Sequence, residues 1–351
     1  MANENQDEVL LKVEHLCQYF GPTKAVDDVS FDVKRGEVFG LVGESGCGKT
    51  TTGRTIMKIY DATSGNVYFN GERIVAGTAS YKQAIKEARK KLKTASTEEE
   101  KKALKDEIDR NRAEISKAQK DHKKRRVIKE IQMIFQDPIA SLNPRMTVKE
   151  IISEGLVIQG VKDKKYIEEQ VYEALEKVGL VREHAGRYPH EFSGGQRQRI
   201  GIARSVIMHP EMIIADEPVS ALDVSIQAQV INLLNDLRKE YGITIMFIAH
   251  DLSVVKYFSD RIGVMYYGKM VELASSEELF AHPLHPYTRS LLSAIPLPDP
   301  ESEKKRTRLV YNKLEAHDYS VQGPTMREII PGHFVYCNDE EEARYKKEIE
   351  G

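Results

Sequence analysis

The sequence predicts an α/β fold in which helices flank a parallel sheet and a smaller antiparallel sheet adjoins it. Two apolar runs, Met212–Ala215 and Ile243–Ile248, have the length of buried strands and are separated by a helical pattern over Ile226–Glu240. Strand, helix and strand in this rhythm are typical of a parallel sheet. Residues 9–40 instead alternate apolar and polar side chains, as antiparallel strands with one face in water do.

The N-terminal half supplies the next elements in order. Val38–Val42 is a short apolar run that ends at a glycine, which predicts a fully buried strand, and a helix should begin near Gly48. The segment Val67–Ile74 contains Asn70-Gly71 between apolar residues, a strong signal for a β-hairpin.

Composition changes between Ala76 and Arg126, where Lys and Arg outnumber Asp and Glu and aliphatic residues are few. The apolar positions that remain follow helical spacing, namely Tyr81, Ile85, Ala88, Leu92, Leu104, Ile108 and Ile115. We therefore expect a charged helical hairpin inserted into the domain. Two roles stay open: a solvated surface excursion, or a contact for a partner or the membrane surface that includes His122–Arg126.

The main domain continues with a buried segment at Ile131–Phe135. Helices are expected over Val148–Gly155 and Tyr166–Val178. Past Leu273 the periodicity weakens and prolines cluster. The tail is therefore expected to be an appendage and not a second full core.

Composition narrows the class of protein. The chain has 351 residues, of which 40% are apolar and 30% charged, values that are ordinary for a water-soluble protein. A net charge of −2 gives no general attraction to nucleic acid, so none is expected as a partner. Cys17, Cys47 and Cys337 lie too far apart for zinc-ligand or CxxC spacing.

The sequence predicts neither a signal peptide nor a transmembrane helix. The opening MANENQDEV is acidic and polar, which predicts no signal peptide. The longest strongly apolar stretch, Ile243–Ala249, falls far short of the ~20 residues that a transmembrane helix needs. If the protein works at a membrane, another chain must hold it there.

A phosphate-binding loop follows the predicted strand at Val38–Val42. The segment fits G-x-x-x-x-G-K-[ST] and consists of Gly43, Glu44, Ser45, Gly46, Cys47, Gly48, Lys49 and Thr50. Its glycines let backbone N–H groups turn inward around phosphate oxygens, and the following helix points its N-terminus at the anion. Lys49 would reach the terminal phosphates, Thr50 would ligate Mg²⁺, and Thr51 would add a phosphate contact.

Two carboxylates end the strand Met212–Ala215. Charges at the carboxyl end of a buried strand face the crevice where ligands bind in such sheets. Asp216 would hold Mg²⁺, directly or through water, and Glu217 would orient and polarise the attacking water. His250 ends the neighbouring strand and is placed to reach a γ-phosphate. The sequence therefore predicts an ATP-hydrolysing site.

A second anion cradle makes the prediction more specific. Phe192 precedes Ser193, Gly194, Gly195 and Gln196, and this SGGQ run lies about 20 residues before the strand that ends in Asp216. The motif resembles the signature of the ABC transporter ATPases. The resemblance implies a P-loop NTPase (RecA-like) parallel-sheet core, an antiparallel β subdomain and a helical signature subdomain. It also implies that each ATP lies between two ATPase chains arranged head to tail.

Other family marks are present, and the resemblance assigns their roles. Gln136 resembles the glutamine that contacts Mg²⁺ and the attacking water and touches the transmembrane subunit. Ser220 and Asp223 resemble the loop that crosses the dimer interface. Phe20 resembles the aromatic residue that stacks on adenine, with Tyr19 as the alternative and a core role for Phe20 also open.

Finer motifs resemble the oligopeptide/dipeptide permease ATPases, and the F-type subunit of Gram-positive bacteria in particular. They are Gln136-Asp137-Pro138, Ser141-Leu142-Asn143-Pro144-Arg145, Tyr188-Pro189-His190-Glu191-Phe192 and His285-Pro286-Tyr287-Thr288. This likeness implies a nucleotide-binding domain at 8–275, with the insertion at 76–126 and the signature subdomain at about 140–205. A permease-type extension would span 276–351.

The resemblance further implies the cofactors, partners and location. We expect ATP and Mg²⁺ as cofactors, a D-type ATPase as heterodimer partner, and two transmembrane permease subunits that receive peptides from an extracellular binding protein. The chain would then sit at the cytoplasmic face of the cell membrane. Many relatives carry a cysteine cluster for iron–sulfur in the tail, but only Cys337 lies there in this chain, so no cluster is expected.

Two other functions stay open from the sequence. The same motor could import nickel or another small solute, because ATPase subunits rarely touch the cargo. A soluble ABC ATPase of translation or DNA repair is the other alternative. Such proteins usually have two cassettes or a long coiled coil, whereas this chain has one cassette and a modest insertion.

Overall fold

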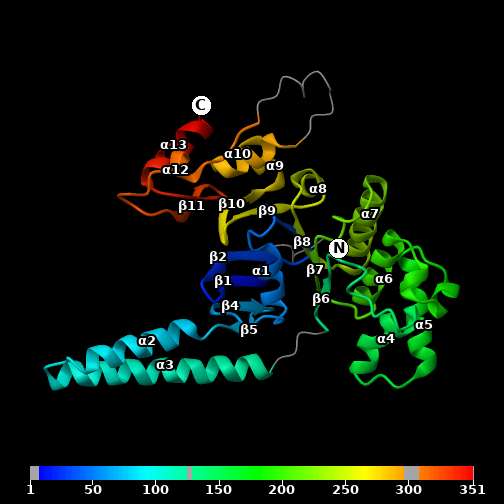
Figure 1. Ribbon diagram of the computed structural model, residues 1–351, viewed down its shortest axis with the longest axis horizontal. Coiled ribbons are helices and arrows are strands. Elements are labelled where there is room, and N and C mark those ends of the chain that lie inside the picture. The colour runs from blue at the N-terminus through cyan, green and yellow to red at the C-terminus, as the bar shows by residue number, and fades with distance from the viewer. Residues whose placement is uncertain (1–7, 125–128, 296–307, 351) are drawn as a thin grey trace. The chain divides into compact units, whose positions relative to one another are not determined.

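The computed structural model describes residues 8–124, 129–295 and 308–350 (Figure 1). These residues form two compact units, and the chain passes between them more than once. One unit contains residues 8–34, 46–124 and 266–269 and the other contains 35–45, 129–265 and the C-terminal segments. Of the predicted basic segment His122–Arg126, residues 125 and 126 lie outside the described residues.

An antiparallel sheet of order β2-β1-β4-β5 forms the first unit. Its strands are β1 (Val9–Phe20), β2 (Thr23–Lys34), β4 (Ser64–Phe69) and β5 (Glu72–Ala76). The predicted hairpin is present: Asn70 and Gly71 have φ of 50° and 72°, as a two-residue type I′ turn requires. Helix α1 (Lys49–Ile56) belongs to the same unit.

The predicted helical hairpin is also present in this unit. Helices α2 (Ala79–Leu92) and α3 (Glu98–Lys124) run side by side (Figure 1). A small apolar cluster of Ile85, Ala88 and Ile108 joins them, with Leu92, Leu104 and Ile115 packed against it. Contacts among these apolar residues, which recur at helical spacing in the sequence, therefore hold the two helices together.

A sheet of order β11-β12-β10-β9-β3-β8-β7-β6 forms the second unit. Its strands are β3 (Val38–Val42), β6 (Ile131–Ile134), β7 (Met212–Asp216), β8 (Thr244–Ala249), β9 (Arg261–Tyr266), β10 (Lys269–Ser275), β11 (Thr325–Ile330) and β12 (His333–Cys337). Strands β3, β6, β7, β8 and β9 pair in parallel. Every residue of β3, β7 and β8 is buried, as expected for strands covered on both faces.

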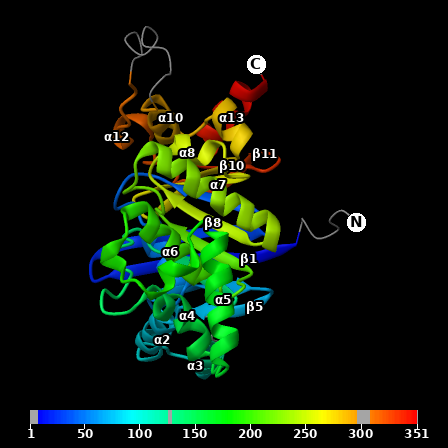
Figure 2. The ribbon, with the colours of Figure 1, turned by 90° about the vertical axis from the view of Figure 1, so that its right-hand side faces the viewer.

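Helices complete this unit. Helices α4 (Val148–Ile158), α5 (Lys164–Lys177) and α6 (Gly194–Val206) pack on one another (Figure 2). The remaining helices are α7 (Val224–Tyr241), α8 (Leu252–Lys256), α9 (Ser276–Ala281), α10 (Pro286–Ser293), α12 (Lys313–Ala316) and α13 (Asp339–Glu350). Two 3₁₀ turns, Arg182–Gly186 and Pro189–Glu191, precede α6.

The C-terminal segment is more integrated with the core than its sequence pattern indicates. Strand β12 pairs antiparallel with β10 and with β11, so the tail lengthens the main sheet. Leu284, Ile329, Val335, Cys337 and Tyr345 form an apolar cluster there, and each is no more than 6% exposed. The α/β class is confirmed, and the tail shares the sheet of the core.

Candidate functional site

The carboxyl end of β7 presents the two predicted carboxylates. Asp216 is the last residue of the strand and is fully buried. Glu217 follows with φ of 45°, a left-handed conformation that costs free energy for any residue other than glycine. Its N–H donates to the Ile248 carbonyl of β8 over 3.0 Å. The backbone therefore turns directly after Asp216, and the Glu217 side chain is only 11% exposed.

Two further predicted residues meet at the Glu217 carboxylate. Gln136 Nε2 donates to Glu217 Oε2 over 3.0 Å, and His250 Nδ1 lies 3.1 Å from the same oxygen. Gln136 follows β6 and His250 follows β8, which flank β7 in the parallel sheet. Parallel strands end at one edge, which brings together residues 81 and 33 positions from Glu217 in the chain.

A small cavity lies beside this cluster. Its volume is about 50 Å³, and its lining includes Glu217, Ser220 and His250. A water molecule needs roughly 10–15 Å³ of such volume and two or more polar partners. The cavity is therefore large enough to hold water, and Glu217 is one of the residues that line it.

The predicted interface loop follows Glu217 directly. Ser220 donates from its N–H and from its hydroxyl to the Glu217 carbonyl, over 3.2 and 3.1 Å. Asp223 is exposed and begins α7 without a cap from its own side chain. Val224, the first residue of α7, is 81% exposed. The loop thus presents both polar and apolar atoms to solvent.

The SGGQ motif forms the N-terminus of α6. Ser193 Oγ accepts from the Gln196 N–H over 3.3 Å, and Gln196 Oε1 accepts from the Ser193 N–H over 3.0 Å, a capping box. Ser193 and Gly194 are exposed. A Cβ on Gly195 would lie 2.8 Å from a side-chain carbon of Ile226, so a larger residue there would displace that side chain. The positive end of a 13-residue helix is therefore open to an anion.

The phosphate-binding loop has the backbone that its glycines permit. Gly43, Gly46 and Gly48 have φ of 147°, 82° and 110°. A Cβ on Gly46 would meet no atom within 4 Å, so the loop is open at that point. Glu44 and Ser45 are exposed. Cys47 is 5% exposed and its sulfur lies 3.8 Å from the Lys49 ammonium.

The residues expected to bind magnesium have suitable chemistry. Thr50 and Thr51 lie in the first turn of α1, and Thr50 contributes a hydroxyl. Asp216 contributes a carboxylate and Gln136 an amide oxygen. These hard oxygen donors fit Mg²⁺, which prefers oxygen ligands and retains several waters.

The structure distinguishes the two aromatic candidates for adenine. The Tyr19 hydroxyl donates to Asp27 over 2.6 Å, and burial together with this bond raises the pKa of Tyr19. Phe20 is 45% exposed, and its ring makes a T-shaped contact with Tyr60, at 5.2 Å between centroids. An exposed ring face suits base stacking, so Phe20 stays the predicted residue.

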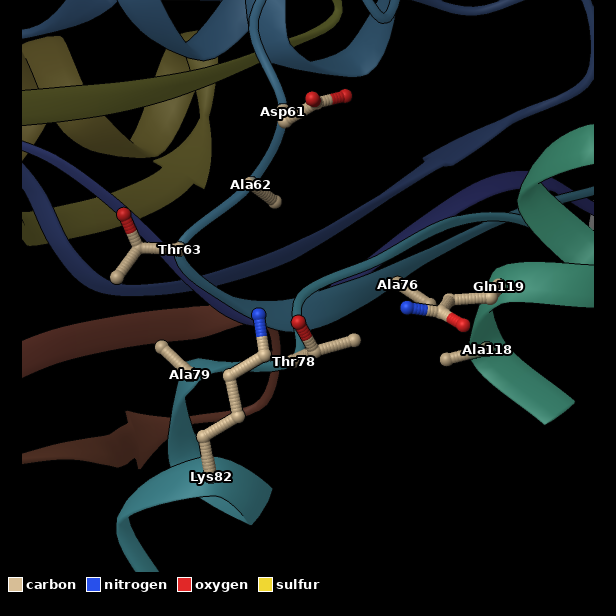
Figure 3. Close-up of a pocket in the computed structure, with 9 residues that line it drawn as sticks. All are labelled: Asp61, Ala62, Thr63, Ala76, Thr78, Ala79, Lys82, Ala118 and Gln119. Atoms are coloured by element: carbon tan, nitrogen blue, oxygen red, sulfur yellow. The ribbon is translucent and has the colours of Figure 1, made fainter. Parts of the chain in front are cut away.

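A larger cavity of about 480 Å³ lies in the unit of the antiparallel sheet (Figure 3). Asp61 and Thr63 line it on one side, and Lys82, Ala118 and Gln119 of the hairpin helices line it on the other. None of the predicted site residues lines this cavity.

Sequence reasoning missed one contact to the phosphate-binding loop. The N–H of Glu44 donates to the Tyr287 hydroxyl over 3.0 Å. The motif His285-Pro286-Tyr287-Thr288 resembles a family motif, but no local pattern shows that Tyr287 contacts a residue 243 positions away.

Comparisons with known proteins agree with this fold. A family model described as "ABC transporter" matches residues 26–105 and 96–220. A second, "Oligopeptide/dipeptide transporter, C-terminal region", matches residues 271–321. The chain therefore belongs to the ABC transporter family.

Curated relatives indicate the group within that family. The chain is 55% identical to the oligopeptide transport ATP-binding protein OppF of Bacillus subtilis, over 95% of this chain and 98% of the relative. It is 50% identical to OppF of Streptococcus mutans, over 92% and 91%. It is 48% identical to the dipeptide transport ATP-binding protein DppF of Lactococcus lactis, over 93% and 92%. The predicted likeness to the F-type permease ATPases is confirmed.

Solved structures show the same fold. CbiO1 of Clostridium perfringens, part of the ABC transporter complex CbiONQ, matches with a TM-score of 0.58 at 26% identity, over 78% of this chain and 92% of that one. MJ1267, an ATP-binding cassette in its ADP conformation, matches with a TM-score of 0.57 at 23% identity, over 78% and 96%. Among the described residues, no helix is both long and apolar enough to cross a bilayer.

Proposed function

We propose that this chain is the ATP-hydrolysing subunit of an ABC importer that takes up oligopeptides. The observation that carries the proposal is the meeting of Gln136 and His250 at one oxygen of the Glu217 carboxylate. A carboxylate held by two neighbours beside a water-sized cavity is suited to act as a general base. Peptide cargo is supported by the names of the relatives, which are oligopeptide or dipeptide transport proteins.

In the proposed mechanism these residues bind the nucleotide, position the attacking water and hold the metal. Lys49 and the loop amides from Gly43 to Thr50 bind phosphate oxygens, and Phe20 stacks on the base. Glu217 orients a water and accepts its proton, and Gln136 and His250 hold the carboxylate in place. Bound Mg²⁺ would neutralise charge on the phosphates, with Thr50, Asp216 and Gln136 as its protein ligands.

We further propose a head-to-tail pair of ATPase chains, with a D-type chain as partner. The open N-terminus of α6 at Ser193–Gln196 would meet a phosphate held by the partner. Ser220, Asp223 and the exposed Val224 would lie at the dimer interface. ATP closes such a pair because it contacts both chains, and hydrolysis reopens it.

Membrane partners follow from the same proposal. Two permease subunits would hold the chain at the cytoplasmic face of the membrane and receive peptides from an extracellular binding protein. Ile139, in the segment after Gln136, is 64% exposed, and Val157 and Ile158 of α4 are 55% and 69% exposed. Such exposed apolar side chains suit contact with another protein. The proposed domain bounds are 8–275 and 276–351, with 76–126 as an insertion.

The test measures uptake of labelled tri- to hexapeptides in cells that lack this chain. We expect rescue by wild type and none by Glu217→Gln. In purified protein Glu217→Gln should retain ATP binding and lose at least about 100-fold in turnover, as loss of a general base does. Glu211→Gln is the matched control: that carboxylate lies just before β7 and pairs with Arg35 at 2.9 Å.

Two outcomes would contradict parts of the proposal. Turnover of Glu217→Gln above about a tenth of wild type would exclude Glu217 as the main catalytic carboxylate. Peptide uptake that never depended on this chain would exclude peptides as its cargo and leave nickel or another small solute as the alternative.

A further inference from the structure

We propose that Tyr287 positions the phosphate-binding loop, so that the C-terminal segment sets the affinity of the chain for ATP; this inference rests on the proposed function. The Tyr287 hydroxyl accepts the hydrogen bond of the Glu44 N–H over 3.0 Å, and Tyr287 is only 2% exposed. Glu44 follows Gly43, whose φ is 147°. Because glycine leaves a peptide free to rotate, a bond on the next N–H restrains the entrance of the loop.

The direction of the Tyr287 side chain is itself determined by its neighbours. His285 caps α10, and its Nδ1 accepts from the Tyr287 N–H over 3.1 Å. Pro286 occupies the first turn, where its fixed φ suits a helix start. Burial, assisted by the neighbouring His317 and Arg289, lowers the pKa of His285 to about 3. The ring therefore stays neutral near pH 7 and keeps a lone pair for the Tyr287 N–H.

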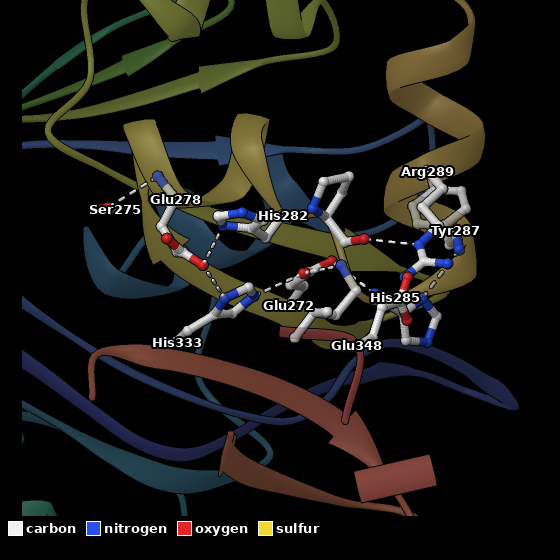
Figure 4. Close-up of polar contacts among 11 residues, drawn as sticks. Glu272, Ser275, Glu278, His282, His285, Tyr287, Arg289, His333 and Glu348 are labelled. Carbon is white, nitrogen blue, oxygen red and sulfur yellow. Dashed lines mark hydrogen bonds and ion pairs between the residues drawn. The ribbon is translucent and has the colours of Figure 1, made fainter. Parts of the chain in front are cut away.

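A buried carboxylate connects this turn to the C-terminal strands (Figure 4). Glu272 of β10 accepts from the N–H groups of Leu284 and His285, over 2.8 and 3.1 Å. The same carboxylate lies 2.8 Å from His333 Nε2 of β12, and both side chains are fully buried. The C-terminal segment thus holds the turn that bears Tyr287.

Arg289 makes a second link between this turn and the C-terminal segment. Arg289 donates to the Pro283 carbonyl over 2.7 Å and to Glu348 of α13 over 2.6 Å (Figure 4). Tyr287 touches the loop and not the reacting atoms, so it acts on ATP through the position of Glu44.

The experiment compares Tyr287→Phe with wild type in the full chain. This variant keeps the ring and removes only the acceptor oxygen. We expect the Glu44 amide to exchange with deuterium about tenfold faster without nucleotide. The KM for ATP should rise about three- to tenfold while kcat stays within about twofold, as loss of one buried hydrogen bond implies. Tyr319→Phe is the control, because it removes a hydroxyl bonded to His317 at 2.9 Å and leaves Glu44 untouched.

Unchanged Glu44 exchange and unchanged KM in Tyr287→Phe would overturn the inference, as would an equal KM shift in Tyr319→Phe. If Tyr287→Phe fails to fold, Glu272→Gln replaces it. We then expect smaller increases in Glu44 amide exchange and in the KM for ATP. No change in either value would overturn the inference. A binding measurement distinguishes failure of this inference from failure of the proposed function. It compares wild type and Lys49→Ala for binding of the magnesium complex of a non-hydrolysable ATP analogue. Equal binding by these two proteins would refute the proposed function itself, whereas loss in Lys49→Ala with an unaffected Tyr287→Phe would refute only the role of Tyr287.

Discussion

Replacement of Glu272 by leucine should loosen the C-terminal segment from the sheet. Glu272 is fully buried and accepts three hydrogen bonds, from the N–H groups of Leu284 and His285 and from His333. Leucine has similar bulk and accepts none of them. Each buried donor left without its acceptor costs about 1–3 kcal/mol, so the loss of all three hydrogen bonds should cost about 4 kcal/mol. A cost of about 4 kcal/mol corresponds to roughly 1,000-fold faster opening.

The glutamine variant gives a graded comparison. Glu272 Oε1 accepts from Leu284 and His333, and Oε2 accepts from His285. A glutamine oxygen can replace Oε1, but its NH₂ group would face the His285 donor in place of Oε2. We therefore expect Glu272→Gln to cost about 1–2 kcal/mol, the value of one unsatisfied buried donor.

The assay is native-state hydrogen exchange at the amides of β12, which reports local opening without assuming that the whole chain unfolds at once. Glu278→Leu serves as the control. That carboxylate lies 3.4 Å from His333 Nδ1 but is 26% exposed, so its loss should cost less than about 1 kcal/mol. The reasoning is refuted if Glu272→Leu speeds exchange less than tenfold, or if the leucine and glutamine variants behave alike.

Two further predictions concern other parts of the molecule. The folded pKa of His285, about 3, lies below its unfolded value of 6.5, so the unfolded chain binds the extra proton and stability is lost as pH falls from 6.5 toward 3. The loss should be about 1.4 kcal/mol per pH unit. Urea unfolding should show a free energy of unfolding that depends more steeply on pH in wild type than in His285→Asn. Equal slopes would contradict the prediction. Gly65 has φ of 85°, and a Cβ there would lie 2.2 Å from the His15 carbonyl oxygen. Gly65→Ala should therefore lower the melting temperature by several degrees, whereas Gly21→Ala, also at positive φ but with no atom within 4 Å, should lower it less.

Most residues of the candidate site could be predicted from short sequence motifs. Gly43–Thr50, Ser193–Gln196 and Asp216-Glu217 are each contiguous, so a local pattern defines them completely. Their elements also follow from local pattern, because buried strands such as β3 and β7 have uninterrupted apolar runs. The hairpin helices α2 and α3 were predictable for the same reason, since their apolar residues recur at helical spacing.

The C-terminal strands had a weaker signal. Strand β12 has five residues, and its sequence, HFVYC, alternates polar and apolar side chains poorly. Its membership in the sheet depends on pairing with β10, which is about 60 residues earlier in the chain. No local pattern records such a partner.

By itself, the sequence determined which residues could bind phosphate, metal and water, because those chemistries need particular side chains at short, regular spacings. The tertiary structure alone decided which of them meet. Gln136, Glu217 and His250 converge because three parallel strands end at one edge of a sheet. Tyr287 reaches Glu44 across 243 positions because Glu272 and His285 orient its turn. Hydrogen bonds between residues so far apart depend on packing, and packing has no local signature in the chain.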